Sequence, residues 1–547
     1  MNEKKQSILV SSLSKIFPED ALPQERLFSF SILRNEKASF QLAFTASAGE
    51  KIDIELVSPL KDSIRVYAVE TIPAGTTRPK GADDFYLPKE KKVFPELLVP
   101  VEKQTFVTKY TGTNTLWFEI SPKDSLPVGE HEIKIQLMQE NTPVVEESVS
   151  CTVLDAILPK QDFIFTNWFH TDCLMSYYGF EAFSDEYWRV TENFLRRGVE
   201  YGMNCVLTPL FTPPLDTKIG GERPTVQLVD VEVVGKNQYR FSFEKFEKWI
   251  EMCDRLGVQY FEINHLFTQW GAKHAPKIVA DIHGVPTKIF GWKTRANGKK
   301  YKLFLAQFAK AFSDFVDEKG IRERCLLHVS DEPSGTMIRG YKKASKIVHD
   351  NFKGFKIVDA LSDYKIYQKG LIETPIPAND HVESFIGNVP ELWTYYCCAQ
   401  FKNNVSNRFF SMPSQRNRVL GYQLYKFDVK GFLHWGFNFY YLQYSKGLID
   451  PYKVTDAGGS FPSGDAFVVY PAKDGTPLDS LRLHVFYDAF QDKMALELLE
   501  SQIGKKRTLE ILEEGLEKPL TFSEYPHSTQ WQLETRERIN HAIQTSL

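Results

Sequence analysis

The sequence predicts a multidomain protein of mixed β and α/β class: an N-terminal antiparallel β-sandwich, a (β/α)8 TIM-like barrel and a helical C-terminal tail. Three observations predict this fold. Residues 1–155 alternate apolar and polar side chains with period two between turn signals. After Pro159, apolar runs alternate with segments of helical period. From about residue 481 the pattern is helical. We therefore expect an accessory sandwich over 1–155, a catalytic barrel over 156–503 and a helical extension over 504–547.

The composition is that of a folded protein with nearly balanced charge. Of the 547 residues, 42% are apolar and 25% are charged, which excludes disorder as the main state. Lys and Arg total 66 and Asp and Glu total 70, so the net charge is −4. This balance lacks the electrostatic footprint of a nucleic-acid or membrane-surface protein, so neither partner is expected. No apolar run approaches the roughly 18 residues that predict a transmembrane helix. The oligomeric state is left open.

The cysteines and the first residues predict a cytoplasmic protein. The start, MNEKKQSILVSSLSKIFPED, has no apolar run long enough for a secretory signal. Seven scattered cysteines without a CxxC motif predict reduced thiols. For the adjacent Cys397 and Cys398 the alternative is a strained vicinal disulfide, and two free thiols are the expected state. The 12 histidines form no HExxH or His-x-His pair, so no metal site is expected. No motif supports an organic cofactor either.

Seven short runs with period-two alternation predict the sandwich. Pro, Gly, Asn and Asp separate them, as is typical of short strands joined by tight turns. The runs are RLFSFSIL (26–33), SFQLAFTAS (39–47), KIDIELV (51–57), SIRVYAVE (63–70), NTLWFEIS (114–121), HEIKIQLM (131–138) and VVEESVSCTVL (144–154). This part contains no catalytic constellation, so we expect a structural or sugar-binding accessory role.

Eight apolar runs, mostly separated by helical segments, predict the barrel. They are FIFTNWF (163–169), NCVLTPLF (204–211), VQYFEINHLF (258–267), CLLHVS (325–330), FKIVDAL (355–361), HVESFIG (381–387), ELWTYYCC (391–398) and GFLHWGFNFY (431–440). Between the sixth and seventh runs only FIGNVP (385–390) is available, which is too short for a helix. Either this crossover is degenerate or one of the two runs is not a barrel strand.

Helical periodicity fills the intervals between these runs. One helix starts at Ser184, and a second ends at Gly257, in the position that favours a left-handed glycine. The apolar faces of the first three helices are Tyr187, Val190, Thr191, Phe194 and Leu195; Phe246, Trp249, Ile250, Cys253 and Leu256; and Tyr301, Phe304, Leu305, Phe308, Phe312 and Phe315. A fourth helix is expected near 338–350.

Long segments follow several of the predicted strands, on the side where barrels carry their chemistry. Residues 212–243 contain two alternating runs around GKN, which predicts an inserted hairpin. Residues 268–300, 399–413 and 441–480 are also long. Long loops on one face predict a deep pocket there.

The sharpest motif is HVSDEPS, residues 328–334. The apolar run CLLHV ends in Asp331 and Glu332, and Pro333 stops the strand. Two adjacent carboxylates do not both ionise easily, so one pKa should rise and that group can act as a general acid. The alternative is that Asp331 or Glu332 only caps the next helix.

Aromatic and polar residues recur at the other predicted strand ends. Rings beside hydrogen-bonding groups suit sugars, whose C–H faces stack and whose hydroxyls need partners. The candidate substrate-binding residues are His170, Asp172, His265, Trp270, Asp359, Asp363, Trp393, Tyr395, Tyr396, Trp435 and Asn438, with Trp168 as a further ring. A carbohydrate is therefore the expected partner.

Four of these rings are predicted to form part of the pocket wall: Trp393, Tyr395, Tyr396 and Trp435. Period two places Trp393 and Tyr395 on one face of their strand and Tyr396 on the other. At least one of the four is therefore expected to be a core residue only.

Several motifs together resemble proteins with a DUF4091 domain, which is related to glycoside hydrolase family 123. They are NEKASFQLAF (35–44), HVSDEP (328–333), LWTYYCC (392–398), GFLHWGFNFY (431–440), PSGDAFVVYP (462–471) and LRLHVFYDAFQDKMAL (481–496). The resemblance extends to about residue 500 and implies a sandwich followed by a barrel. HLFTQWGAKHAPKI (265–278) and SNRFFSMPS (406–414) look like a subgroup pattern.

The resemblance implies a retaining exo-β-N-acetylgalactosaminidase that uses substrate-assisted catalysis, with no cofactor. The tandem Asp-Glu of that family matches Asp331 and Glu332. In this chemistry the 2-acetamido oxygen of the sugar attacks the anomeric carbon, so no carboxylate nucleophile is needed. Glu332 would protonate the leaving oxygen, and Asp331 would orient the acetamido N–H and stabilise the oxazolinium charge. Both side chains can reach one sugar only if the strand ends at Pro333.

Two other functions compete with this one. An ordinary two-carboxylate glycosidase would pair Glu332 with a distant carboxylate, for which Asp172, Asp216 and Glu262 are candidates. A non-catalytic sugar-binding protein would keep the pocket without turnover. Release of nitrophenol from a panel of glycosides separates the three.

Overall fold

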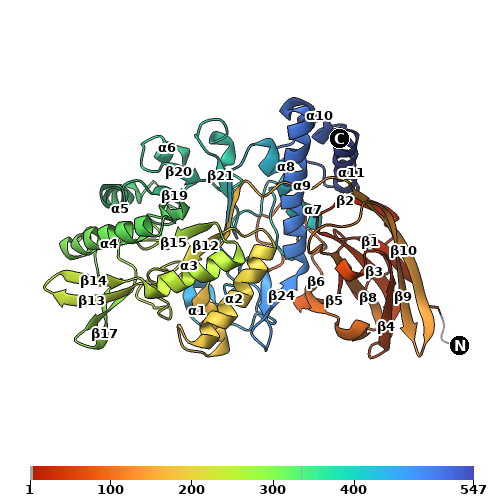
Figure 1. Ribbon diagram of the computed structural model, residues 1–547, viewed down its shortest axis with the longest axis horizontal. Helices are drawn as coiled ribbons and strands as arrows, with labels where there is room; N and C mark the ends of the chain where they lie inside the picture. Colours follow the sequence, from red (N-terminus) through yellow and green to blue (C-terminus); the bar gives the residue numbers. More distant parts are fainter. Residues whose placement is uncertain (1–3, 334, 547) are drawn as a thin grey trace.

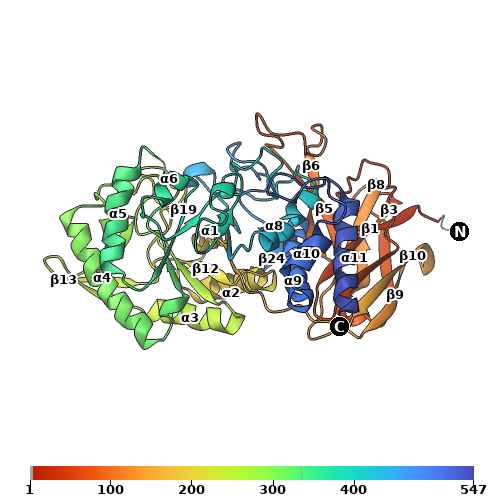
Figure 2. The ribbon, with the colours of Figure 1, turned by 90° about the horizontal axis from the view of Figure 1, so that it is seen from above.

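The computed structural model describes residues 4–333 and 335–546. A β-rich N-terminal part and an eight-stranded barrel lie side by side along the long axis of the molecule (Figures 1 and 2). The long helix α9 (Leu481–Ile503) runs between them.

The N-terminal part contains two sheets that share one apolar core. Their strand orders are β1-β3-β8-β5-β6-β24-β23 and β2-β10-β9-β4-β7. Phe40 and Phe118 of the first sheet join Ile54 and Ile135 of the second in this core. The strands are β1 (Ser7–Ser11), β2 (Ser29–Leu33), β3 (Ala38–Ala46), β4 (Lys51–Val57), β5 (Ile64–Pro73), β6 (Val93–Pro100), β7 (Thr105–Val107), β8 (Gly112–Ile120), β9 (Gly129–Gln139) and β10 (Thr142–Leu154).

All seven predicted strands of this part are present, but two features of the prediction are wrong. The sheets are not wholly antiparallel, because β2 pairs with β10 in parallel. The first sheet also continues past residue 155, because β24 (Pro477–Ser480) pairs with β6 and with β23 (Val469–Pro471). Pairings between strands hundreds of residues apart leave no periodic signal in the sequence. The strands β1, β6 and β7 were not predicted.

The barrel is a parallel sheet with the order β20-β19-β18-β15-β12-β11-β22-β21. A single parallel bridge between Ala378 and Tyr395 almost closes its remaining seam. The strands are β11 (Ile164–Asn167), β12 (Cys205–Thr208), β15 (Tyr260–Ile263), β18 (Cys325–Leu327), β19 (Lys356–Ala360), β20 (Thr374–Ile376), β21 (Trp393–Tyr395) and β22 (Gly431–His434). Seven of them lie within predicted runs. As predicted, β18 is not an edge strand, because it pairs with β15 on one side and with β19 on the other.

The sixth predicted strand is wrong. Residues Val382–Ser384 form a 3-10 turn, and the sixth strand is the three-residue β20. The apolar residues Val382 and Phe385 are three positions apart, which is the spacing of a turn of 3-10 helix rather than of a strand. The neighbouring crossovers are short, with only α6 (Tyr364–Tyr367) before β20.

The barrel helices include the four that the sequence predicts, together with unpredicted short helices near 171–178 and 414–426. They are α1 (Thr171–Tyr178), α2 (Asp185–Glu200), α3 (Glu244–Leu256), α4 (Lys299–Glu318), α5 (Ile338–Asn351), α7 (Ser414–Arg418) and α8 (Leu420–Lys426). The Ser184 hydroxyl caps α2 by accepting from the Tyr187 N–H, and Gly257 ends α3 with φ of 89°. All five predicted apolar residues of α2 are buried.

Two hairpins inserted after β12 and β15 combine into a four-stranded sheet. Its order is β14-β13-β16-β17, from β13 (Asp230–Gly235), β14 (Gln238–Ser242), β16 (Ile278–Ile282) and β17 (Val285–Phe290). This sheet projects from the barrel at the left of Figure 1. The hairpin within 212–243 was predicted, whereas the one within 268–300 was not.

The C-terminal helices bind the two parts together. Helix α9 is followed by α10 (Lys505–Leu512) and α11 (Thr529–Thr545), which confirms the helical tail. Buried Arg536 on α11 forms ion pairs with Glu36 at 2.7 Å and with Asp492 on α9 at 2.9 Å. The tail therefore contacts the β-rich part through Glu36 and the central helix through Asp492.

None of the helices in residues 4–333 and 335–546 combines the length and the apolar character that crossing a membrane requires.

Candidate active site

A pocket opens at the carboxyl ends of the barrel strands, where the sequence predicted it. We call it the inner pocket. Its lining residues are Trp168, Leu215, Asp216, Gln269, Trp270, Asp331, Glu332, Ala360, Tyr395, Cys397, Cys398, Leu433, Trp435 and Phe461. The rings and the three carboxylates come from different strand-to-helix segments, so the barrel brings them together.

Asp331 and Glu332 both line this pocket because the backbone leaves the extended conformation between them. Strand β18 ends at Leu327, and Glu332 has φ of 41°, in the left-handed region. A regular strand would point adjacent side chains to opposite faces. The sequence argument required the strand to end before both side chains could reach one pocket. The strand does end before the pair, although at Leu327 and not at Pro333.

The helix-capping alternative for this pair is not supported. Helix α5 begins at Ile338, and the residue before it is Met337, which makes no side-chain capping bond. Asp331 and Glu332 therefore lie too far upstream to cap that helix.

Three non-glycine residues of the inner pocket have left-handed backbone conformations. Asp216 has φ of 40°, Trp270 of 57° and Glu332 of 41°. Each such conformation costs on the order of 1 kcal/mol and persists only where the surroundings enforce it. Strained residues gathered at one pocket indicate a functional site.

Burial makes two carboxylates of this pocket, Asp331 and Asp216, easier to protonate than exposed ones. Burial and the neighbouring Glu332 carboxylate raise the pKa of Asp331 well above its usual range. Burial also raises the pKa of Asp216 to about 6, although the Tyr444 N–H donates to its carboxylate at 2.9 Å. The Tyr395 hydroxyl donates to Glu332 Oε1 at 2.5 Å. Burial thus favours the protonated form of Asp331, and Glu332 accepts a hydrogen bond from Tyr395.

Buried carboxylates hold two indoles of the pocket wall. Trp168 Nε1 donates to Glu262 Oε1 at 2.8 Å, and Trp435 Nε1 donates to Asp465 Oδ2 at 2.8 Å. Each acceptor is at most 1% exposed. A buried N–H bonded to a buried carboxylate fixes the ring plane, so both indoles are preorganised as stacking surfaces.

Four predicted substrate-binding residues line a pocket. Trp270, Tyr395 and Trp435 line the inner pocket. Asp363 lines a neighbouring outer pocket, which meets the inner pocket at Glu332 and Tyr395. Trp168, noted as a strand-end ring, also lines the inner pocket.

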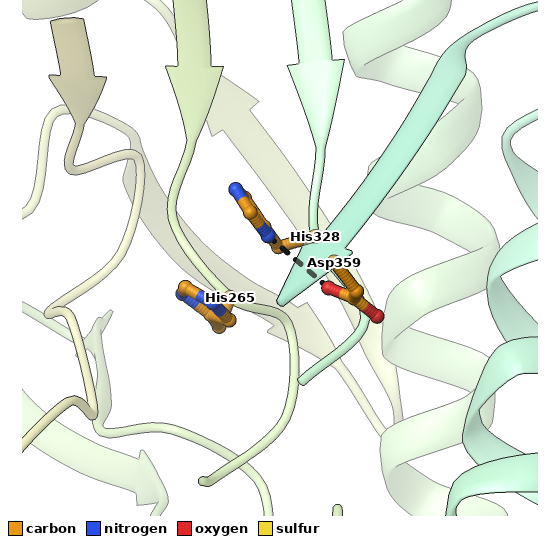
Figure 3. A group of neighbouring side chains, drawn as sticks. All are labelled: His265, His328 and Asp359. Carbon is orange, nitrogen blue, oxygen red and sulfur yellow. Dashed lines mark hydrogen bonds and ion pairs between the residues drawn. The ribbon is translucent and has the colours of Figure 1, made fainter. Parts of the chain in front are cut away.

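The other predicted substrate-binding residues lie below or beside the pocket. His170, Asp172 and Asn438 form a separate cluster in which Arg223 donates to Asp172 at 2.6 Å and to His170 at 3.2 Å. The His170 N–H donates to the amide oxygen of Asn438 at 2.8 Å. His265 and Asp359 lie beside His328 (Figure 3) and line neither the inner nor the outer pocket.

Trp393 and Tyr396 are core residues in this structure. The Trp393 ring fills the barrel interior, where a Cβ on Gly431 would approach it to 1.9 Å. Tyr396 packs against Phe432 and His434 on the opposite face of β21. The period-two argument is confirmed on this point: Tyr396 points away from Trp393 and Tyr395.

Several lining residues were not among the predicted site residues. Gln269 and Phe461 belong to long loops, and their side chains carry no periodic signal. Cys397 and Cys398 were noted only for their redox state, and both are free thiols. Asp216 was named only as a possible second carboxylate. Its position shortly after a predicted strand is the one sequence signal that could have placed Asp216 among the site residues.

The buried Asp465 gives a pH-dependent prediction. Burial raises the pKa of Asp465 to about 7, so between about pH 4 and pH 7 the folded protein binds a proton that the unfolded chain releases. This contribution to stability is lost as the pH rises through 7. Asp465→Asn keeps an acceptor for Trp435 but cannot titrate. We expect the melting temperature of the wild type to fall more between pH 5 and pH 8 than that of Asp465→Asn. Equal changes in the two proteins would contradict the assignment.

The barrel, the adjacent carboxylates and the ring-lined pocket define the class of protein: a glycoside hydrolase. The model of the glycoside hydrolase 123 catalytic domain matches residues 168–499. The chain belongs to glycoside hydrolase family 123.

A solved structure of a family 123 enzyme has the same fold. A family 123 glycoside hydrolase from Clostridium perfringens, studied for glycolipid glycan hydrolysis, superposes with a TM-score of 0.75 at 15% identity, over 99% of this chain and 98% of that one. A family 2 enzyme from Bacteroides cellulosilyticus matches at 12% identity with a TM-score of 0.31, over 80% of this chain and 48% of that one. A family 39 enzyme from Bacteroides cellulosilyticus matches at 9% identity with a TM-score of 0.30, over 85% and 81%. Among proteins with curated descriptions, none matches this chain.

Proposed function

We propose that this enzyme is a retaining exo-β-N-acetylhexosaminidase, with N-acetylgalactosamine as its sugar, and that it uses substrate-assisted catalysis. The observation that carries the proposal is the adjacent pair Asp331 and Glu332, which turns into a single ring-lined pocket. The similar Clostridium perfringens enzyme, described in connection with glycolipid glycan hydrolysis, supports a glycan as substrate.

The proposed roles require the shared proton to move when substrate binds. In the ligand-free site the pKa of Asp331 is raised, whereas catalysis needs the proton on Glu332. Two neighbouring carboxylates that share one proton titrate as one unit. A hydrogen-bond donor that binds to one of them stabilises its ionised form, so the shared proton then favours the other carboxylate. An acetamido N–H directed at Asp331 is such a donor. Substrate binding would therefore leave Asp331 ionised and Glu332 protonated.

A panel of nitrophenyl glycosides tests the proposal. We expect turnover of the 2-acetamido β-glycosides, with the galacto sugar preferred over the gluco sugar, and none of the 2-hydroxy β-glycosides. N-fluoroacetyl substrates should react more slowly as fluorine is added, because it weakens the attacking oxygen. The first sugar released should be the β-anomer by NMR. Turnover of 2-hydroxy glycosides at a rate similar to that of the 2-acetamido glycosides would rule out the substrate-assisted mechanism.

The second candidate is the two-carboxylate mechanism with Asp216 as the partner of Glu332. Of the three carboxylates considered, Asp216 alone lines the inner pocket. Asp172 is engaged by Arg223, and Glu262 accepts from Thr166, Trp168 and His328. Accumulation of a covalent glycosyl-enzyme in wild type, absent from Asp216→Asn, would favour this mechanism.

The outer pocket predicts a preference for neutral leaving groups. Four acidic side chains line this pocket: Glu332, Asp363, Asp380 and Glu383. One lysine, Lys365, also lines it, so acidic groups outnumber lysines there. A like charge on the leaving sugar would be repelled, and about 1.4 kcal/mol corresponds to a tenfold change in rate.

We expect kcat/KM for a galactose leaving group to exceed that for a glucuronic acid leaving group by about tenfold at low salt. The ratio should fall at high salt and in Asp363→Asn combined with Glu383→Gln. A nitrophenyl substrate is the control for intact catalysis. An unchanged ratio in the double variant would exclude these carboxylates as the cause.

A further inference from the structure

A chain of three buried ionisable side chains lies next to residues that line the inner pocket. Glu262 on β15, His328 after β18 and Asp359 on β19 come from three neighbouring strands and are at most 1% exposed. His328 Nε2 lies 2.5 Å from Glu262 Oε1, and His328 Nδ1 lies 3.1 Å from Asp359 Oδ1. Figure 3 shows His328 directed at Asp359, with the His265 ring alongside.

This geometry determines the protonation of His328. Each ring nitrogen faces a carboxylate oxygen, which can only accept when ionised. Against two ionised carboxylates a neutral imidazole would set one lone pair against a carboxylate oxygen, so this pair of contacts favours a ring with a proton on both nitrogens. Consistent with this, hydrogen bonds to Asp359 and Glu262 outweigh burial and raise the pKa of His328 to about 10.

The same group could be considered as a metal site, because donor atoms of His265, His328 and Asp359 lie within 4.8 Å of one another. The ring geometry opposes this. The His265 and His328 rings stack, with centroids 4.3 Å apart and planes at 26°. Stacked rings direct their in-plane lone pairs side by side rather than to a common point, and both nitrogens of His328 are already engaged. Burial and the charge on His328 lower the pKa of His265, which fits a neutral ring against a cationic one.

Each end of the chain holds a different part of the active site. Glu262 accepts from Trp168 Nε1 at 2.8 Å and so fixes a ring of the pocket wall. Asp359 accepts from the backbone N–H groups of Val329 at 3.1 Å and Ser330 at 3.4 Å. These two residues immediately precede Asp331, where the backbone turns into the pocket.

We propose that His328 is a positioning residue: a buried imidazolium that bonds both Glu262 and Asp359, and through them sets the Trp168 wall and the turn that presents Asp331 and Glu332. The kinetic part of this inference rests on the proposed function. The charge of His328 does not, so the two can fail separately.

NMR of protein labelled with 15N at its histidine rings tests the charge. We expect one histidine with two slowly exchanging ring N–H protons and imidazolium nitrogen shifts, unchanged from pH 6 to pH 9. The charged or titratable groups around it are Glu262, Asp359, His265 and Asp331. The signals should vanish in His328→Gln and persist in His484→Gln, which removes another buried histidine paired with an aspartate. If the signals that disappear in His328→Gln have the nitrogen shifts of a neutral imidazole, His328 is not charged and the proposal is overturned.

Kinetics of the two carboxylate variants test the positioning. Glu262→Gln should raise KM at least fivefold with kcat within threefold of wild type, because Trp168 contacts the bound sugar. Asp359→Asn should lower kcat at least tenfold with KM within threefold, because the reacting pair is displaced. His484→Gln controls for lost stability and should change neither constant. Identical effects of the two carboxylate variants on KM and kcat would indicate a merely structural role. If wild type shows no turnover of any glycoside, the proposed function fails and the NMR result still decides the charge.

Discussion

Glu332→Gln is expected to lose about 10²–10⁴-fold in kcat on a natural glycan and to stay close to wild type on a dinitrophenyl glycoside. A loss of about 10²–10⁴-fold is the usual effect of removing a general acid. A dinitrophenolate leaves without a proton, so its departure hardly depends on Glu332. Glutamine keeps the size of the side chain and an acceptor for the Tyr395 hydroxyl.

Three measurements make this result specific. Rates are compared for aryl glycosides whose leaving-group pKa varies, and the dependence should steepen in Glu332→Gln. Azide should restore turnover of Glu332→Ala on the activated substrate, because it replaces the water that Glu332 would activate in the second step. Glu323→Gln, at the other end of β18, is the matched control and should behave as wild type. An equal loss on all leaving groups would contradict the acid role.

Asp331→Asn is expected to lose about 10²–10³-fold on natural and activated substrates alike. The oxazolinium forms whichever group leaves, and loss of a charged group that stabilises a developing charge has this order of effect. Asparagine removes the anion but retains the side-chain shape. Azide should not rescue Asp331→Ala, because the defect lies in forming the intermediate.

The raised pKa of Asp331 adds a pH signature to this prediction. In the free enzyme the pair should release its proton above the usual carboxyl range, because burial and Glu332 favour the protonated form of Asp331. The profile of kcat/KM should carry this apparent pKa and lose it in Asp331→Asn. Melting temperatures of both variants are compared first, so that unfolding is not mistaken for lost chemistry.

Other outcomes have defined meanings. If Asp331→Asn is spared on activated substrates while Glu332→Gln is not, the two roles are exchanged. If both variants keep full activity, the chemistry does not depend on this pair, and Asp216 becomes the carboxylate to examine in the inner pocket.

The sequence by itself determined the features that depend on short-range order. The alternation of residues 114–121 and the helical spacing on α2 each arise within a few turns of chain, where side-chain period and secondary structure are directly linked. The same holds for the apolar run that stops before Asp331 and Glu332, since an apolar run followed by a proline is a local signal. The one wrong barrel strand, 381–387, shows the limit: a short apolar run does not distinguish a strand from a turn of 3-10 helix.

Only the tertiary structure decided which polar and aromatic residues meet. Trp168 and Trp435 line the pocket whereas Trp393 and Tyr396 are core, although all four follow the same kind of pattern. His328 contacts Glu262, 66 residues earlier, and Asp359, 31 residues later. Asp172 forms an ion pair with Arg223, which belongs to a long loop. Such partners are selected by closure of the barrel, which brings distant segments together and leaves no trace in local periodicity. The chemistry of each side chain is written in the sequence, but its partner, and therefore its charge and role, is set by the fold.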